Sequence, residues 1–95
     1  MDIRFIKDLA ERWARKHPDL RPRIARAISL VSHVAYIGED TWEVIGSRGD
    51  TYYVGVNHAH RTSTCTCPDS ELGYHCKHRI AVALVWASSN PWIFH

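Results

Sequence analysis

The chain has 95 residues, is 45% hydrophobic, and carries 12 Lys/Arg against 10 Asp/Glu. These values are typical of one soluble globular domain. A core of this size contributes only roughly 3–5 kcal/mol to the free energy of unfolding, so a bound metal would help the chain to fold. The longest apolar run, Ile80 to Ala87, is too short to span a bilayer, and charged residues stand where a secretion signal would be apolar. We expect an intracellular protein without a membrane partner, cytoplasmic or, in a eukaryote, nuclear.

The first third of the chain predicts two helices. Residues 2–16 repeat apolar side chains at helical spacing with charges between them, which is typical of an amphipathic helix. This helix should end before Pro18, because the residue before proline is pushed out of the α region. A second helix is expected over residues 19–33 with Asp19 as its cap. Residues 1–34 are therefore predicted to form a helical hairpin that packs on the remainder of a single compact domain.

After residue 34 the pattern changes to the β-branched and aromatic runs typical of strands. An antiparallel hairpin is expected between residues 41–46 and 51–56, turning at Gly49. A third extended piece is expected over residues 61–65.

A last helix is expected over residues 76–89, since Pro91 would end it. Its stretch from Ile80 to Trp86 has no polar face, so the helix must be covered on more than one side. The sheet can cover one side and the helical hairpin the other. The predicted fold class is α+β, with residues 35–95 forming a β-hairpin, this helix and a short apolar tail.

All three cysteines lie within 14 residues of one another, together with a histidine. Cys65 and Cys67 are separated by one residue, as are Cys76 and His78, and such close pairs present their ligand atoms to a shared metal ion. Three thiolates and one imidazole fill a structural zinc site and suit zinc better than an iron–sulfur cluster. An odd cysteine count argues against disulfides. We expect one structural Zn²⁺ that joins the sheet to the helix.

Two alternatives stay open at this point. The cysteines could be buried free thiols, with His78 an ordinary surface residue. A neighbouring histidine could also replace or support one of the four ligands, the candidates being His58, His60 and His75.

The order Cys-x-Cys, eight residues, Cys-x-His resembles the SWIM-type zinc finger. The runs Trp42–Val44 and Tyr52–Val54, and the apolar helix after His78, are similar to the two strands and the ligand-bearing helix of that family. The resemblance covers roughly residues 41–86. It implies a ββα zinc finger that acts as a DNA-binding or protein-interaction module in recombination, transposition or transcription.

The charge is unevenly distributed along the chain. Residues 1–34 carry eight Lys/Arg against four Asp/Glu, and residues 35–95 carry four against six. A dense group of cations can bind phosphates with release of counterions. The candidate nucleic-acid-binding residues lie around the turn between the two helices and beside the metal ligands: Arg12, Arg15, Lys16, Arg21, Arg23, Arg26, Lys77 and Arg79.

The apolar C-terminal end favours a competing function. Trp86, Trp92, Ile93 and Phe94 could dock a protein partner such as a recombinase paralog, or a second copy in a homodimer, although packing within the monomer explains the same pattern. No nucleophile and base pair or open metal site is apparent, so we expect neither an enzyme nor a small-molecule substrate. The prediction is a zinc-binding accessory protein that binds nucleic acid or, alternatively, a protein–protein interaction subunit.

Overall fold

A computed structural model describes residues 3–46, 48–57, 62–67 and 76–89. Helices α1 (Ile3–Lys16) and α2 (Arg21–Ile28) precede a sheet, and helix α4 (Lys77–Ser89) follows it. The sheet is antiparallel with strand order β1 (Val34–Gly38), β2 (Thr41–Ile45), β3 (Thr51–Asn57) and β4 (Thr62–Cys65). This architecture confirms the α+β class. Within the described ranges no helix has the length and apolar character needed to cross a membrane.

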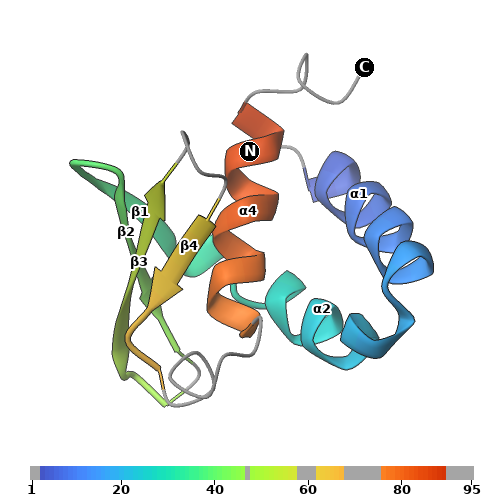
Figure 1. Ribbon diagram of the computed structural model, residues 1–95, viewed down its shortest axis with the longest axis horizontal. Helices are drawn as coiled ribbons and strands as arrows, with labels where there is room; N and C mark the ends of the chain where they lie inside the picture. The colour runs from blue at the N-terminus through green and yellow to red at the C-terminus, as the bar shows by residue number, and fades with distance from the viewer. Residues whose placement is uncertain (1–2, 47, 58–61, 68–75, 90–95) are drawn as a thin grey trace.

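Helix α4 lies between the sheet and the helices α1 and α2, and packs against both (Figure 1). One buried cluster runs through all three layers: Ile6 of α1, Ala27 of α2, Val44 and Val54 of the sheet and Leu84 of α4 are each 0% exposed. The cover on two sides explains why the stretch of α4 from Ile80 to Trp86 has no polar face. The N-terminal helices therefore complete the core of the C-terminal part.

Helix α1 has the expected amphipathic character. Ile6, Leu9 and Ala10 are buried, whereas Ile3 on the first turn is 44% exposed. Near the other end, Arg15 pairs with Glu11 one turn earlier at 3.5 Å. Both side chains of this pair are exposed, so the burial of the apolar stripe contributes far more to stability than the ion pair does.

The second helix is shorter than predicted. A 3₁₀ turn, Pro18–Leu20, precedes α2, and a second 3₁₀ turn, Val31–His33, follows it. Asp19 lies inside the first turn, and α2 begins after Leu20 without a side-chain cap, which corrects the predicted capping role. At the other end the Ser29 hydroxyl donates to the Arg26 carbonyl at 2.7 Å, a local bond that favours the tighter turn over continued α-helix.

The predicted hairpin and the position of its turn are confirmed. Strands β2 and β3 pair with Ile45 opposite Thr51, and the Gly46 amide donates to the Asp50 carbonyl at 2.7 Å across the turn. Gly49 has a φ of +85°, where an L side chain would be strained. The glycine therefore allows the chain to reverse at this point.

Strand β1 and its pairing with β2 are additional to the prediction. The two strands are joined by a turn in which Gly38, Glu39 and Asp40 all have positive φ, at 100°, 52° and 56°. The Asp40 amide donates to the Tyr36 hydroxyl at 3.2 Å, and the Asp40 carbonyl accepts from the Val56 amide at 2.9 Å. These tertiary bonds hold two non-glycine residues in a conformation that their types rarely adopt.

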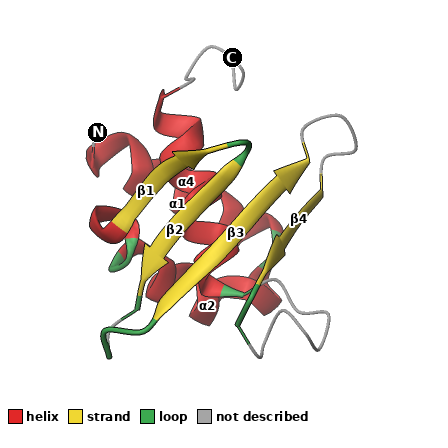
Figure 2. Cartoon of the chain, turned by 90° about the vertical axis from the view of Figure 1, so that its left-hand side faces the viewer, coloured by secondary structure: helices red, strands yellow, loops and turns green. Residues whose placement is uncertain are grey.

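The two faces of the sheet differ in what covers them. Val44 and Val54 face α4, while the large side chains exposed from the sheet include Ile45 at 40% and Tyr53 at 44%. Figure 2 shows the described helices together behind the sheet, so none of them covers the outer face.

We predict that the helical hairpin and the sheet unfold as one unit. Replacing Ile6 by Ala removes a fully buried side chain of α1 and should lower the free energy of unfolding of the whole domain by about 2–5 kcal/mol. Urea unfolding followed by far-UV circular dichroism and by tryptophan fluorescence should give one shifted transition in both signals. Ile3→Ala on the exposed part of the same helix is the control and should change stability by less than about 0.5 kcal/mol. Two separate transitions would contradict a shared core.

Candidate metal centre

The first predicted ligand pair lies at the end of β4. Cys65 pairs with Val54 across the sheet and so shares the face that is directed toward α4. Thr66, between the two cysteines, is held by Tyr53 of β3 through two hydrogen bonds: its amide donates to the Tyr53 carbonyl at 3.2 Å, and its hydroxyl oxygen accepts from the Tyr53 amide at 3.1 Å. The turn that carries Cys65 and Cys67 is thereby fixed to the centre of the sheet.

The second pair lies at the entry to α4. Cys76 immediately precedes the helix, and its carbonyl accepts the Ile80 amide at 3.2 Å, which closes the first turn around His78. The Arg79 Nε donates to the Ser63 hydroxyl of β4 at 2.8 Å and ties this turn to the sheet. The helix entry is therefore held beside the strand that ends in the first ligand pair.

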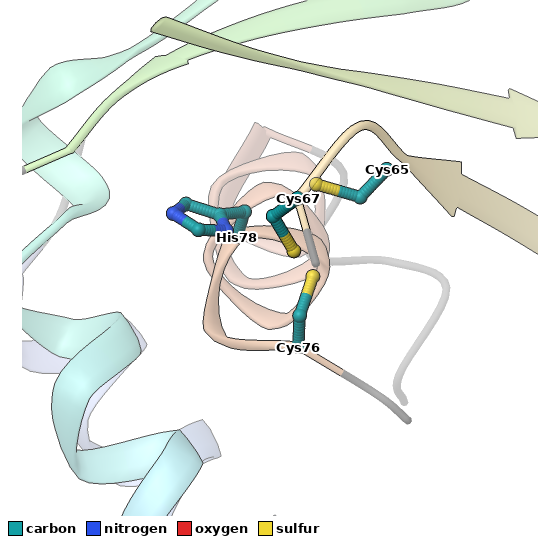
Figure 3. A group of neighbouring side chains, drawn as sticks. All are labelled: Cys65, Cys67, Cys76 and His78. Carbon is teal, nitrogen blue, oxygen red and sulfur yellow. The ribbon is translucent and has the colours of Figure 1, made fainter. Parts of the chain in front are cut away.

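The fold brings all four predicted ligands together (Figure 3). One ligand atom from each of Cys65, Cys67, Cys76 and His78 lies within 4.8 Å of every other. The four residues are 9%, 3%, 0% and 4% exposed, and the three cysteines are not in disulfides. These side chains form a closed cluster between the sheet and α4.

The segment that carries this cluster matches a known protein family. Residues 54–87 match the model of the SWIM zinc finger, a range that contains the second part of β3, the whole of β4, all four ligand-type residues and most of α4. This segment is therefore similar to a SWIM zinc finger, and we call it the SWIM finger. Searches among curated proteins and among solved structures gave no match. Helices α1 and α2 and strands β1 and β2 lie outside the matched range and are built onto the finger.

The environment of His78 supports a metal ion in the finger. Neither ring nitrogen has a hydrogen-bond partner within the described part of the chain, although both are buried. A buried polar atom without a partner is destabilising, and a metal bond to one nitrogen would relieve this. The Tyr52 ring lies against the imidazole with centroids 4.3 Å apart and restricts its orientation. The donor set, three thiols and an imidazole, is consistent with one zinc ion.

The thiols of the finger interact directly with one another. The Cys65 thiol donates a hydrogen bond to Cys76, and this bond is the main reason that the pKa of Cys76 falls to about 3. The same bond, together with burial, raises the pKa of Cys65. One thiolate is thus available to a metal at neutral pH, while Cys65 must lose its proton when it becomes a ligand.

The predicted basic residues are distributed over two environments. Those in α1 and around the turn into α2 are exposed, except that Arg23 is half-buried, as are Lys77 and Arg79 at the start of α4. The exposed residues are Arg12, Arg15, Lys16, Arg21 and Arg26.

Several sequence predictions concern residues outside the described ranges. Among the apolar residues proposed for protein interaction, Trp86 is half-buried on α4, and Trp92, Ile93 and Phe94 lie outside those ranges. The rival histidines His58, His60 and His75 lie outside them as well.

Three residues that support the site were not found from the sequence. Thr66 anchors the first ligand pair, Ser63 holds the helix entry, and Tyr52 packs against His78. The alternation of β3 carried a signal for Tyr52, since it lies two residues before the buried Val54 and so shares its face. Hydroxyl residues carry no comparable signal, because their partners are far away in the sequence.

We predict that the finger requires His78 to hold zinc. His78→Ala removes one of four ligands and should lower zinc content, measured by atomic absorption on purified protein, to less than half of the wild-type value. The melting temperature should fall in parallel, because zinc binding contributes to folding. His33→Ala changes an exposed histidine of the same chain and is the matched control. Full zinc occupancy in His78→Ala would contradict the assignment.

The protonation of the thiols predicts how zinc affinity depends on pH. The raised pKa of Cys65 means that zinc must displace at least this proton, so affinity should fall as pH falls, by roughly tenfold for each unit and proton displaced. Competition with a chromophoric chelator between about pH 8 and pH 5.5 measures the slope. An affinity that stays constant over this interval would show that no cysteine proton is displaced.

Proposed function

We propose that this chain is a SWIM module, stabilised by one structural zinc ion, that binds DNA through a basic corner between α1 and α2. We define the basic corner as the exposed residues Arg12, Arg15, Lys16, Arg21 and Arg26. The module would act as an accessory protein in a process such as recombination, transposition or transcription. The observation that carries the proposal is the exposure of these five cations on α1 and α2, four of which lie between Arg12 and Arg21 on either side of one turn.

The zinc ion itself is assigned a structural role. Cys65, Cys67, Cys76 and His78 supply four ligands, which completes a tetrahedral shell and leaves no position for substrate or activated water. The ion would connect the end of β4 to the entry of α4 and stabilise both. A closed, buried ion offers no contact to a partner, so the binding surface is sought elsewhere on the domain.

The positions of the cations within the helices support a binding role. Arg15 and Lys16 lie in the last turn of α1, where positive charge stabilises the helix through its dipole, so helix stability alone explains them. Arg21 is the first residue of α2, whose first turn contains no acidic residue, and a cation at this end opposes the dipole. Because helix stability does not explain Arg21, an external anion such as a phosphate is the better explanation.

Four of the five cations lie on either side of the turn between α1 and α2. Arg15 and Lys16 follow Arg12 by three and four residues on α1, and each therefore lies beside Arg12 on the helix surface. The 3₁₀ turn Pro18–Leu20 then leads directly into Arg21. Two helix surfaces therefore meet at one corner with an excess of positive charge, as binding to a phosphate backbone requires.

We predict that the double variant Lys16→Gln/Arg21→Gln binds DNA more weakly than the wild type. Fluorescence anisotropy with a labelled duplex of about 20 base pairs should show a fall of roughly tenfold at low salt. The slope of log affinity against log salt should become smaller by about 0.9 for each phosphate that the variant no longer neutralises. The matched control Lys7→Gln/Arg48→Gln removes the same charge from exposed residues outside the corner.

The outcomes of this comparison are distinct. Equal affinity of the test and control variants would assign DNA binding to a surface other than the basic corner. Absence of salt-dependent binding in the wild type would exclude the proposed function.

Protein interaction is the second candidate, and the outer face of the sheet supports it. Ile45 and Tyr53 are 40% and 44% exposed on this face of the sheet, and no described helix covers it (Figure 2). Exposed apolar groups of this size favour contact with a protein more than with a phosphate backbone. Under this alternative the double variant at the basic corner would leave partner binding unchanged.

A further inference from the structure

A pocket of about 410 Å³ lies where the N-terminal helices meet the SWIM finger. Its lining comes from two parts of the chain: Trp13, His17 and Leu20 lie before the matched family segment, and Arg79 and Ile80 lie within it. The volume falls within the range of small-molecule sites, about 300–1,000 Å³. The pocket therefore exists only because the helices are built onto the finger, and we call it the junction pocket.

One wall of the junction pocket is apolar. Trp13 of α1, Leu20 of the 3₁₀ turn and Ile80 of α4 contribute to it, and a smaller hollow of about 190 Å³ beside it shares these three residues. Trp13 and Leu20 are only partly buried by the fold, so their surface is available to a flat apolar ligand. Aromatic side chains in such positions stack on nucleobases.

The remaining lining is polar and carries both signs of charge. His17 and Asp19 are exposed at the turn, and the half-buried Arg79 has its Nε bonded to the Ser63 hydroxyl at 2.8 Å. This bond holds the guanidinium at the pocket and gives it a defined position. Arg79 can attract a phosphate, whereas the Asp19 carboxylate can accept hydrogen bonds only from donors such as the N–H groups of a base.

We infer that the junction pocket holds one unpaired nucleotide of a DNA strand, with its base against Trp13 and its phosphate toward Arg79. The inference rests on the proposed function, since the basic corner continues into the pocket: Lys16 precedes His17, and Arg21 follows Leu20. A paired base is stacked inside the duplex and cannot reach a pocket, so the module should prefer DNA with an unpaired nucleotide.

The mixture of charges favours a nucleotide over an acidic peptide. A nucleotide presents a phosphate to Arg79 and base N–H donors to Asp19, so both groups are matched. The carboxylates of an acidic peptide would be attracted by Arg79 and repelled by Asp19. The pocket thus fits a ligand that combines an anion, a flat apolar ring and hydrogen-bond donors.

The test compares three labelled duplexes of one sequence. One is fully paired, one carries a single unpaired guanine as a bulge, and one carries an abasic bulge at the same place. Anisotropy titrations of the wild type should give roughly tenfold tighter binding to the guanine bulge than to either other duplex, because only this duplex offers a base to stack.

Two variants locate the effect in the pocket. Trp13→Leu keeps an apolar side chain but removes the stacking surface, and should abolish the preference, measured as the ratio of the affinities for the guanine bulge and the paired duplex. Trp42→Leu removes a partly buried tryptophan of the sheet, outside the pocket lining, and is the matched control. Zinc content and melting temperature verify that each variant is folded.

Asp19→Ala gives an independent signature, since this residue is exposed and its replacement should not disturb folding. The variant should bind the paired duplex slightly more tightly, because a repulsive charge is removed, and should show a smaller preference for the guanine bulge. A purely structural role for Asp19 would not move the two affinities in opposite directions.

The possible failures are distinguishable. If no duplex binds, both the proposed function and this inference are overturned. Three other results would overturn only the inference about the junction pocket. They are equal binding to all three duplexes, an abasic bulge that binds as tightly as the guanine bulge, and a preference that persists in Trp13→Leu. If Trp13→Leu instead weakens binding of a labelled peptide of alternating Asp and Phe, and no bulge preference exists, the pocket belongs to a protein partner.

Discussion

The junction between the end of β4 and the entry of α4 is the constraint on which the rest of the domain depends. Four ligand-type side chains meet there, and two further contacts surround them: Thr66 is bonded to β3, and Arg79 is bonded to Ser63. A metal ion at this point would replace the unfavourable burial of thiols and an imidazole with four strong bonds. It would also fix the angle at which α4 leaves the sheet, and with it the position of every layer that packs on α4.

The position of helix α4 in turn determines where the N-terminal helices lie, because they pack against it. Its stretch from Ile80 to Trp86 is apolar on all sides, so the sheet covers one side and α1 and α2 cover the other (Figure 1). The added helices give the SWIM finger more than a larger core, since they carry the basic corner and one half of the junction pocket. In this arrangement the buried cluster maintains the fold, while the proposed contacts with nucleic acid lie on surfaces that the cluster positions but does not form.

The sequence by itself determined the elements whose causes are local. The spacing of Cys65, Cys67, Cys76 and His78 predicted the cluster, because each pair is carried by one short turn or one helical turn. The apolar periods predicted α1 and α4, and Gly49 predicted the β2–β3 turn, because these features depend on residues close together in the chain. The basic residues around the helical turn are also close together in the chain, so the sequence alone shows them.

Only the tertiary structure decided the features that depend on distant partners. Strand β1 was missed because its turn places Glu39 and Asp40 at positive φ, a conformation held by contacts with Tyr36 and Val56. The second helix is shorter than its apolar pattern because Ser29 bonds back to Arg26 and the chain tightens into 3₁₀ turns. The junction pocket combines side chains that are far apart in the chain, from the 3₁₀ turn and from α4. The pattern of a sequence shows which side of a single helix or strand is apolar. These features instead depend on contacts between two elements.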